Sequence, residues 1–260
     1  MDPALSKLFD LSGRVAIVTG STKGIGRSIA QGLAQAGASV VVSSRDQEAC
    51  ERVADEIAAT TGAGTLAAAC HMGDWDAIGG LVEGTRERFG RIDIVFNNAG
   101  IHPRPMSVME LTSEFFDKLY AVNLKGPVRL AGLVAPIMAE QGSGSIVNVA
   151  TIGAYSGGAN VGTYTALKAA LINFTKVMAK EWASLGIRVN ALCPGPFDSE
   201  MMRGTTKLDP GFIPRSAAAT LQGRVADCDE IIGAALYLAS DASSFVTGED
   251  HVVSGGMLRG

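Results

Sequence analysis

The chain has 260 residues, of which 47% are hydrophobic and 18% charged, so it contains enough apolar material for a folded core. A formal net charge of -4, without a Lys/Arg cluster, argues against a nucleic-acid or anionic membrane surface. The four cysteines form no C-x-x-C pair and the three histidines no H-E-x-x-H motif, so we expect free thiols and no metal site. The first ten residues lack the apolar core of a signal peptide, and no apolar stretch is long enough for a bilayer; we expect a cytoplasmic protein.

Short β-branched runs alternate with longer Ala-rich amphipathic segments. The runs predict buried strands at residues 14–19, 40–43, 66–70, 92–96, 145–149 and 187–192. Helices are predicted at about 25–36, 46–59, 74–89, 116–140, 163–184 and 227–239. This alternation is typical of a parallel sheet, and right-handed crossovers make it doubly wound. We expect one α/β domain over residues 1–260, with a Rossmann-type doubly wound parallel sheet of about seven strands and helices on both faces.

One long irregular stretch interrupts this alternation at residues 194–225, and it contains Gly, Pro, Met and Thr. Segments of that length inside a compact domain are usually functional or mobile. We therefore expect a substrate lid over about 194–225.

A glycine-rich turn follows the first strand, with glycines at positions 20, 24 and 26. Glycines permit a tight turn and a close approach of the backbone to a pyrophosphate, and the following helix directs its N–H groups at the phosphates. The alternative is a purely structural strand-to-helix turn, but the place directly after an N-terminal strand favours a nucleotide.

The end of the second strand discriminates between dinucleotides. An NAD site places an acidic residue there to accept a hydrogen bond from the ribose 2′-OH. Here Ser44 and Arg45 follow, and a guanidinium can hold a 2′-phosphate. Lys23 adds a second cation, so the sequence predicts NADP(H) as cofactor; the alternative is that both cations are ordinary solvated charges.

Tyr164 and Lys168 are four residues apart and share one face of a predicted helix. A nearby ammonium favours the phenolate, so we expect a lowered tyrosine pKa and a tyrosine able to act as acid or base. The spacing alone is weak evidence, because one such pair can arise by chance.

The neighbouring motifs add specificity. In chain order they are Thr19-Gly20-x-x-x-Gly24-x-Gly26, Asn97-Asn98-Ala99-Gly100, Asn123, Tyr164-x-x-x-Lys168 and Pro194-Gly195. With this combination the chain resembles the short-chain dehydrogenase/reductase family over about residues 11–256.

The resemblance implies a site for the cofactor and a site for catalysis. The implied cofactor-binding residues are Gly20, Ser21, Thr22, Lys23, Gly24, Ile25, Gly26, Ser44, Arg45, Asn98, Ala99, Gly100, Tyr164, Lys168, Pro194, Gly195 and Ser199. Tyr164 would donate or accept the proton while hydride passes between the nicotinamide and the substrate carbon. Lys168 would bind the nicotinamide ribose and lower the pKa of Tyr164, and Asn123 would hold a water linking Lys168 to solvent.

Four positions depart from the family pattern. Thr151 stands where the family usually has a serine, thirteen positions before Tyr164; it keeps the hydroxyl that would bind the substrate oxygen but adds a methyl group. His71-Met72 replaces an aspartate expected near the adenine, which puts that contact in doubt. Ser199 and Ser254 replace a threonine and an aspartate.

Other residues leave alternatives open. His102, after the fourth strand, could contact substrate, although a solvated loop histidine is the simpler interpretation. The helices at 116–140 and 163–184 carry apolar residues on more than one face, which indicates an oligomer interface; the resemblance implies a homodimer or homotetramer.

The sequence thus predicts an oxidoreductase that moves hydride between NADP(H) and a small-molecule ketone or secondary alcohol. The first alternative is a 3-oxoacyl-(acyl-carrier-protein) reductase, whose acidic carrier could dock on Lys125 and Arg129. That alternative ranks lower because Leu185 occupies a position where such reductases often have a basic residue. An alternative of another class is a catalytically silent nucleotide-binding scaffold or sensor, which the presence of Tyr164 and Lys168 disfavours.

Overall fold

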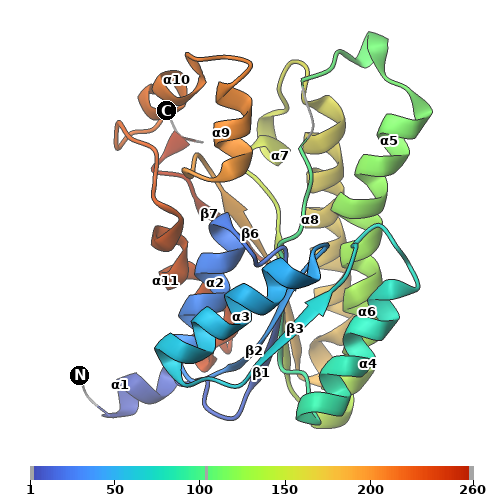
Figure 1. Ribbon diagram of the computed structural model, residues 1–260, viewed down its shortest axis with the longest axis vertical. Coiled ribbons are helices and arrows are strands. Elements are labelled where there is room, and N and C mark those ends of the chain that lie inside the picture. The colour runs from blue at the N-terminus through green and yellow to red at the C-terminus, as the bar shows by residue number, and fades with distance from the viewer. Residues whose placement is uncertain (1–2, 103–104, 258–260) are drawn as a thin grey trace.

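Residues 3–102 and 105–257 are described by the computed structural model, and within them seven parallel strands form one sheet (Figure 1). The sheet order is β3-β2-β1-β4-β5-β6-β7, which confirms the predicted doubly wound α/β fold. The strands are Val15–Thr19 (β1), Ser39–Ser44 (β2), Thr65–Ala69 (β3), Ile94–Asn97 (β4), Gly144–Val149 (β5), Ile187–Pro194 (β6) and Asp250–Val253 (β7). The apolar pattern of the sequence predicted no residue range for β7.

Helices cover both faces of the sheet. Their bounds are Pro3–Leu8 (α1), Gly24–Gln35 (α2), Gln47–Thr61 (α3), Ala77–Phe89 (α4), Ser113–Tyr120 (α5), Gly126–Gln141 (α6), Gly153–Ser156 (α7), Gly162–Trp182 (α8), Glu200–Thr206 (α9), Phe212–Ala218 (α10) and Ile232–Ala239 (α11). No helix within the described residues is both long and apolar enough to cross a membrane.

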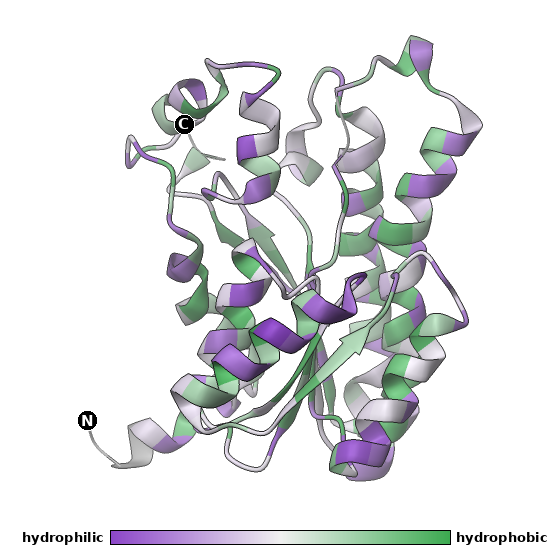
Figure 2. Ribbon diagram, viewed as in Figure 1, coloured by the Kyte–Doolittle hydropathy of each residue, from purple (hydrophilic) through white to green (hydrophobic). Residues whose placement is uncertain are grey.

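Two apolar layers hold the helices on the sheet. Figure 2 shows mostly hydrophobic colours along the strands. Alternate residues of a strand point to opposite faces. Ala16 and Val18 of β1 therefore pack with α2, α3 and α11, while Ile17 packs with α4, α6 and α8. All three side chains are completely buried, and this explains why the strands are continuously apolar in sequence.

The predicted helix over 116–140 is wrong as a single element, because a π-helical turn at Ala121–Lys125 separates α5 from α6. Pro127 explains the interruption. A proline has no N–H, so the carbonyl of Asn123, four residues earlier, loses the hydrogen bond that an α-helix would supply. The backbone widens there, and Asn123 lies in the widened turn.

The strand order reverses between β1 and β4, which are neighbours in the sheet although β2 and β3 separate them in sequence. Ligands of doubly wound folds bind beyond the carboxyl ends of the strands at such a reversal. The segments after β1, β2 and β4 contain the glycine turn, Arg45 and Asn98–Gly100. The fold therefore brings the predicted cofactor residues to one edge of the sheet.

Candidate active site

The glycine turn is packed so closely that side chains are excluded. Gly20 and Gly24 have φ values of 65° and 55°, which favour glycine. A Cβ on Gly26 would stand 2.4 Å from the Gly20 carbonyl oxygen and 2.3 Å from Nδ2 of Asn98. Helix α2 starts at Gly24, so its first N–H groups lie in the same turn. This cradle of bare backbone fits a dinucleotide pyrophosphate.

Asn98 and Thr19 connect the glycine turn to β4. The side-chain amide of Asn98 donates to the carbonyl oxygens of Thr19 and Gly20, at 2.9 and 3.1 Å. In return, the Thr19 hydroxyl accepts from the N–H groups of Asn98 and Ala99, at 3.1 and 3.0 Å. These bonds fit the predicted supporting role of residues 98–100, since they fix the ends of two adjacent strands.

Ser21 contributes to the turn through its side chain. Its hydroxyl donates to the Val18 carbonyl at 2.6 Å and accepts from the Ser43 N–H at 3.0 Å. The residue is fully buried, so the side chain joins β1 to β2. The Ser21 N–H also donates to the Ser43 carbonyl at 3.1 Å, so both donors of Ser21 are used within the fold.

The two predicted 2′-phosphate cations differ in their surroundings. Arg45 is exposed, and no ion pair to it occurs among residues 3–102 and 105–257. Lys23 pairs with Glu200, the first residue of α9 in the predicted lid. Arg45 is therefore the cation with a free guanidinium, while Lys23 ties the glycine turn to the lid.

Tyr164 and Lys168 lie one turn apart on α8, beside the end of β5. Lys168 is buried, and its ammonium donates to the Val149 carbonyl at 2.7 Å. Burial disfavours the charge and lowers the pKa of Lys168 to about 8.

The expected lowering of the Tyr164 pKa is wrong for this structure. Burial raises the pKa of Tyr164 to about 12, because desolvation penalises the phenolate. The Lys168 ammonium, which is bonded to a backbone carbonyl, does not bring the pKa of Tyr164 below its ordinary value. The phenol is accordingly protonated near neutral pH.

Asn123 has a structural role that the sequence did not predict. Its carboxamide accepts from the Ile101 N–H at 3.1 Å and donates to the Ile101 carbonyl at 3.0 Å. It also donates to the Leu119 carbonyl at 3.1 Å. A Cβ on Gly100 would stand 3.0 Å from the Asn123 Oδ1 and 3.6 Å from the Lys168 ammonium, so these residues are neighbours. The water at Asn123 stays a prediction.

Thr151 follows β5 and is half-buried. Its hydroxyl accepts from the Gly153 N–H at 3.3 Å. A Cβ on Gly153 would stand 3.7 Å from both the hydroxyl oxygen and the methyl carbon of Thr151. These are ordinary contact distances, so Thr151 does not itself require a glycine at position 153, whereas a Cβ there would stand only 3.0 Å from the methyl carbon of Thr165.

The segment after β6 lies against both the last strand and the glycine turn. The Gly195 N–H donates to the Val253 carbonyl at 2.9 Å, next to Pro194 at the end of β6. The Ser199 hydroxyl accepts from the Met202 N–H at 3.4 Å and caps α9. A Cβ on Gly24 would stand 3.5 Å from the Ser199 Cβ, which places the start of the lid beside the predicted phosphate cradle.

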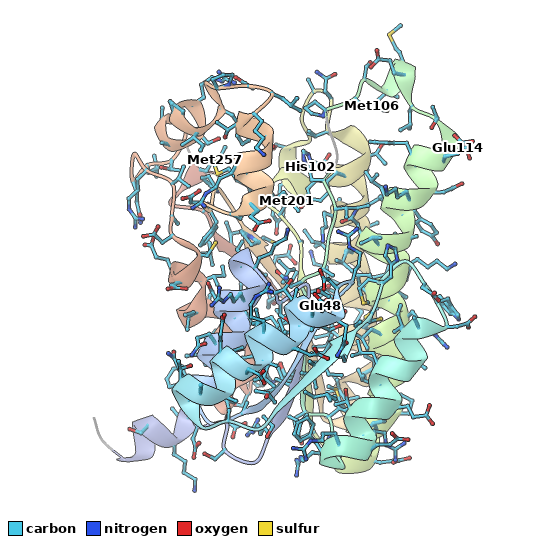
Figure 3. The ribbon with its side chains drawn as sticks, viewed as in Figure 1. Glu48, His102, Met106, Glu114, Met201 and Met257 are labelled. Atoms are coloured by element: carbon cyan, nitrogen blue, oxygen red, sulfur yellow. The ribbon has the colours of Figure 1, made fainter. Side chains whose placement is uncertain are left out.

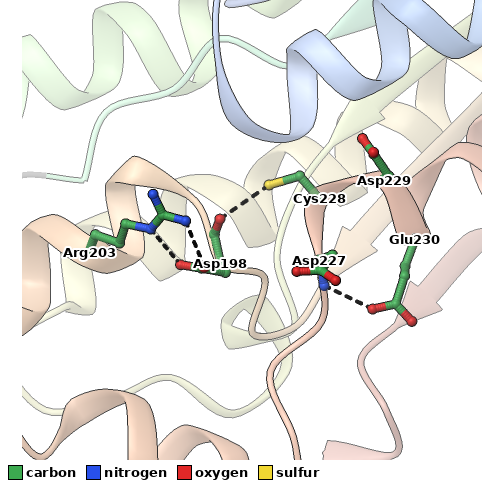
Figure 4. A pocket seen from close by; sticks show the side chains of 6 residues that line it. All are labelled: Asp198, Arg203, Asp227, Cys228, Asp229 and Glu230. Atoms are coloured by element: carbon green, nitrogen blue, oxygen red, sulfur yellow. Dashed lines mark hydrogen bonds and ion pairs between the residues drawn. The ribbon is translucent and has the colours of Figure 1, made fainter.

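The predicted lid contains two short helices, α9 and α10, in place of a wholly irregular stretch. An open cavity of about 540 Å³ lies at its base, lined by Asp198, Arg203, Asp227, Cys228, Asp229 and Glu230 (Figure 4). Its charges are satisfied within the fold: Asp198 pairs with Arg203, and the Ser28 hydroxyl donates to Asp229. Tyr164 does not line this cavity, and the Ser28–Asp229 bond joins α2 to the segment that follows the lid.

His102, labelled in Figure 3, belongs to the site and is more than a solvated loop residue. Its half-buried ring packs edge-to-face on Tyr164, with the ring centroids 4.8 Å apart. The position after Asn98–Gly100 was the only available sequence signal for this contact.

Comparisons with known proteins agree with this geometry. The sequence model of the family described as Enoyl-(Acyl carrier protein) reductase matches residues 20–258. Dehydrogenase/reductase SDR family member 4 of Bos taurus is 39% identical over 95% of this chain and 88% of its own length. The 3-oxoacyl-(acyl-carrier-protein) reductase of Salmonella typhimurium is 34% identical over 94% of this chain and 97% of its own.

Among solved structures, a gluconate 5-dehydrogenase from Burkholderia cenocepacia in complex with NADP and tartrate superposes with a TM-score of 0.93. It is 34% identical, and the match covers 98% of this chain and 99% of that one. The motifs, the fold and these similarities lead to one assignment: the chain belongs to the short-chain dehydrogenase/reductase family and is an oxidoreductase of carbonyls or alcohols.

Proposed function

We propose that this chain is an NADP(H)-dependent ketone reductase or secondary alcohol dehydrogenase in which Tyr164 carries the proton. One observation carries the proposal: the Tyr164 phenol and the buried Lys168 ammonium share a face of α8 at the edge of the sheet that contains the glycine cradle. The NADP complex of the Burkholderia relative supports the choice of cofactor.

The chemistry follows from the surroundings of these side chains. Bound NADP(H) supplies or accepts the hydride. Tyr164 holds a proton at Oη and, in reduction, donates it to the substrate oxygen, where the Thr151 hydroxyl also hydrogen-bonds. Lys168 stabilises the phenolate that remains. A Tyr164 pKa of about 12 keeps the proton in place at neutral pH until charge develops on the substrate oxygen, so the site suits reduction.

The NADP(H) preference rests on Arg45, which is exposed and unpaired within the described residues. We expect Arg45→Asp to weaken NADPH binding by about a hundredfold, because it replaces a cation with a repelling anion, and to change NADH binding far less. Fluorescence titration with both cofactors measures this. Arg52→Asp, an exposed change on α3, is the control and should leave both affinities intact. Equal losses for NADPH and NADH in Arg45→Asp would refute the assignment.

A small free substrate suits the surface better than an acyl carrier. The cations available for carrier docking, Lys125 and Arg129, lie over the ring of Trp75 at 5.3 and 4.4 Å from its centroid. Part of the electrostatic attraction that these two cations could offer an acidic carrier is already used in cation–π contacts with that ring. The 3-oxoacyl activity named for the Salmonella relative therefore remains the second candidate.

We further propose a cytoplasmic homotetramer. Half-exposed apolar side chains on α5 and α8, at Phe116, Tyr120, Phe174 and Val177, support association through these helices. The free cysteines, three of them buried, support a reducing compartment.

A further inference from the structure

The ring of His102 lies against the catalytic phenol. The two rings meet at an interplanar angle of 83°, so an edge of one faces the other. His102 follows β4, whereas Tyr164 lies on α8, so the contact joins two walls of the site. Because only Tyr164 in this pair has the proton-transfer role, the second ring calls for a separate explanation.

The position of His102 is fixed by its neighbour in the chain. Both backbone groups of Ile101 are bonded to the carboxamide of Asn123, which is completely buried in the π-helical turn. The backbone directly before His102 is thus anchored to the same side chain that lies beside Lys168. Such an anchored ring is preorganised for binding.

The hydrogen-bonding capacity of the ring is unused within the described part of the chain, where no bond to either nitrogen of His102 occurs. Burial lowers the pKa of His102, so the imidazole is neutral at neutral pH. A neutral imidazole offers one N–H donor and one lone-pair acceptor. A hydroxyl group matches that pair, whereas a carboxylate can only accept and would find a single uncharged donor.

We propose that His102 is a specificity-determining residue that binds a hydroxyl on the carbon next to the reacting carbonyl, so that α-hydroxy ketones are preferred over plain ketones. The inference rests on the proposed reductase function. The edge contact places the imidazole next to the phenol that protonates the carbonyl oxygen, and so near substituents of the adjacent carbon. The occupant is then an uncharged hydroxy carbonyl compound.

The test compares 3-hydroxy-2-butanone with 2-butanone, which differ by that one hydroxyl. His102→Phe keeps an aromatic edge against Tyr164 and removes both polar nitrogens. We expect kcat/KM for the hydroxy ketone to fall about tenfold or more beyond any fall for 2-butanone, as is usual when a substrate hydroxyl loses its partner. His102→Asn, which restores a donor and an acceptor, should recover part of the preference.

His251→Phe is the matched control, because His251 makes the same kind of edge contact with Tyr237, at 5.8 Å between β7 and α11. It should keep the wild-type ratio of kcat/KM values. An unchanged ratio in His102→Phe would mean that the ring only packs, and would overturn this inference while leaving the reductase function intact. A wild-type protein that binds NADPH but reduces neither ketone nor any other carbonyl compound would overturn both.

Discussion

Burial sets the charge states of the two central side chains. It raises the pKa of Tyr164 to about 12 and lowers the pKa of Lys168 to about 8. The phenol is therefore the protonated partner throughout the neutral range, while the amine is charged only below about pH 8. A pH dependence of reduction follows from the amine.

We expect the rate of ketone reduction to fall as the pH rises through about 8, because Lys168 then loses the proton that stabilises the phenolate. Lys168→Met should lower kcat by about a hundredfold and remove this fall. The pH profile of kcat under saturating NADPH measures both effects. Lys176→Met, farther along α8 in an exposed pair with Asp250, should retain the wild-type profile. A fall near pH 8 that persists in Lys168→Met would assign it to another group.

Single residues were predictable from the sequence where spacing decided their place. Tyr164 and Lys168 are one helical turn apart, and the spacing of the glycines after the first strand predicted the tight turn. The raised pKa of Tyr164 and the His102 contact were not predictable, because both depend on the packing of segments far apart in sequence. The same holds for the Asn123 bonds to Ile101, which cross 22 positions.

The helices and strands matched their predicted ranges where the apolar pattern and the residues that begin or end a helix indicated the same boundaries. The helix predicted at 46–59 appears as Gln47–Thr61, with Asp46 accepting from the Ala49 N–H at its start and Gly62 at its end. The π-helical turn at Ala121–Lys125 escaped prediction because the apolar pattern continues through it. Only the missing N–H of Pro127 marked the interruption.

The glycine turn allows a direct test at this scale. Gly26→Ala places a methyl group 2.4 Å from the Gly20 carbonyl oxygen, so we expect a loss of about 1–3 kcal/mol in unfolding free energy and of NADPH affinity. Gly84→Ala, in α4 with open space around it, should instead stabilise by up to about 1 kcal/mol with normal affinity. Thermal melts and NADPH titration compare the two; equal behaviour would contradict the close packing.

At the scale of the whole molecule, the doubly wound sheet was predictable because apolar strands alternate with helices and crossovers are right-handed. The position of β7 was not predictable, because its four residues, Asp250–Val253, include two polar ones and form no continuous apolar run. The lid helices α9 and α10 were also missed, as each has only seven residues. Short elements depend on contacts more than on their own pattern.

Assembly is the prediction that belongs to this scale. We expect a tetramer in light scattering after size exclusion, and a smaller mass for Phe174→Glu, because a carboxylate would be buried in the helix interface. Met109→Glu, at a side chain that is 96% exposed in the described structure, is the control and should leave the mass unchanged. A wild-type monomer would contradict the proposed assembly.

Proton transfer by Tyr164 is the central claim of this account. Removal of the phenol hydroxyl tests that claim most directly. NADPH oxidation with a reducible ketone should be slowed at least about a hundredfold in Tyr164→Phe, while NADPH binding persists. Tyr155→Phe, which removes a hydroxyl 3.4 Å from the Cys193 sulfur, should remain active. Near-wild-type turnover by Tyr164→Phe would contradict the account.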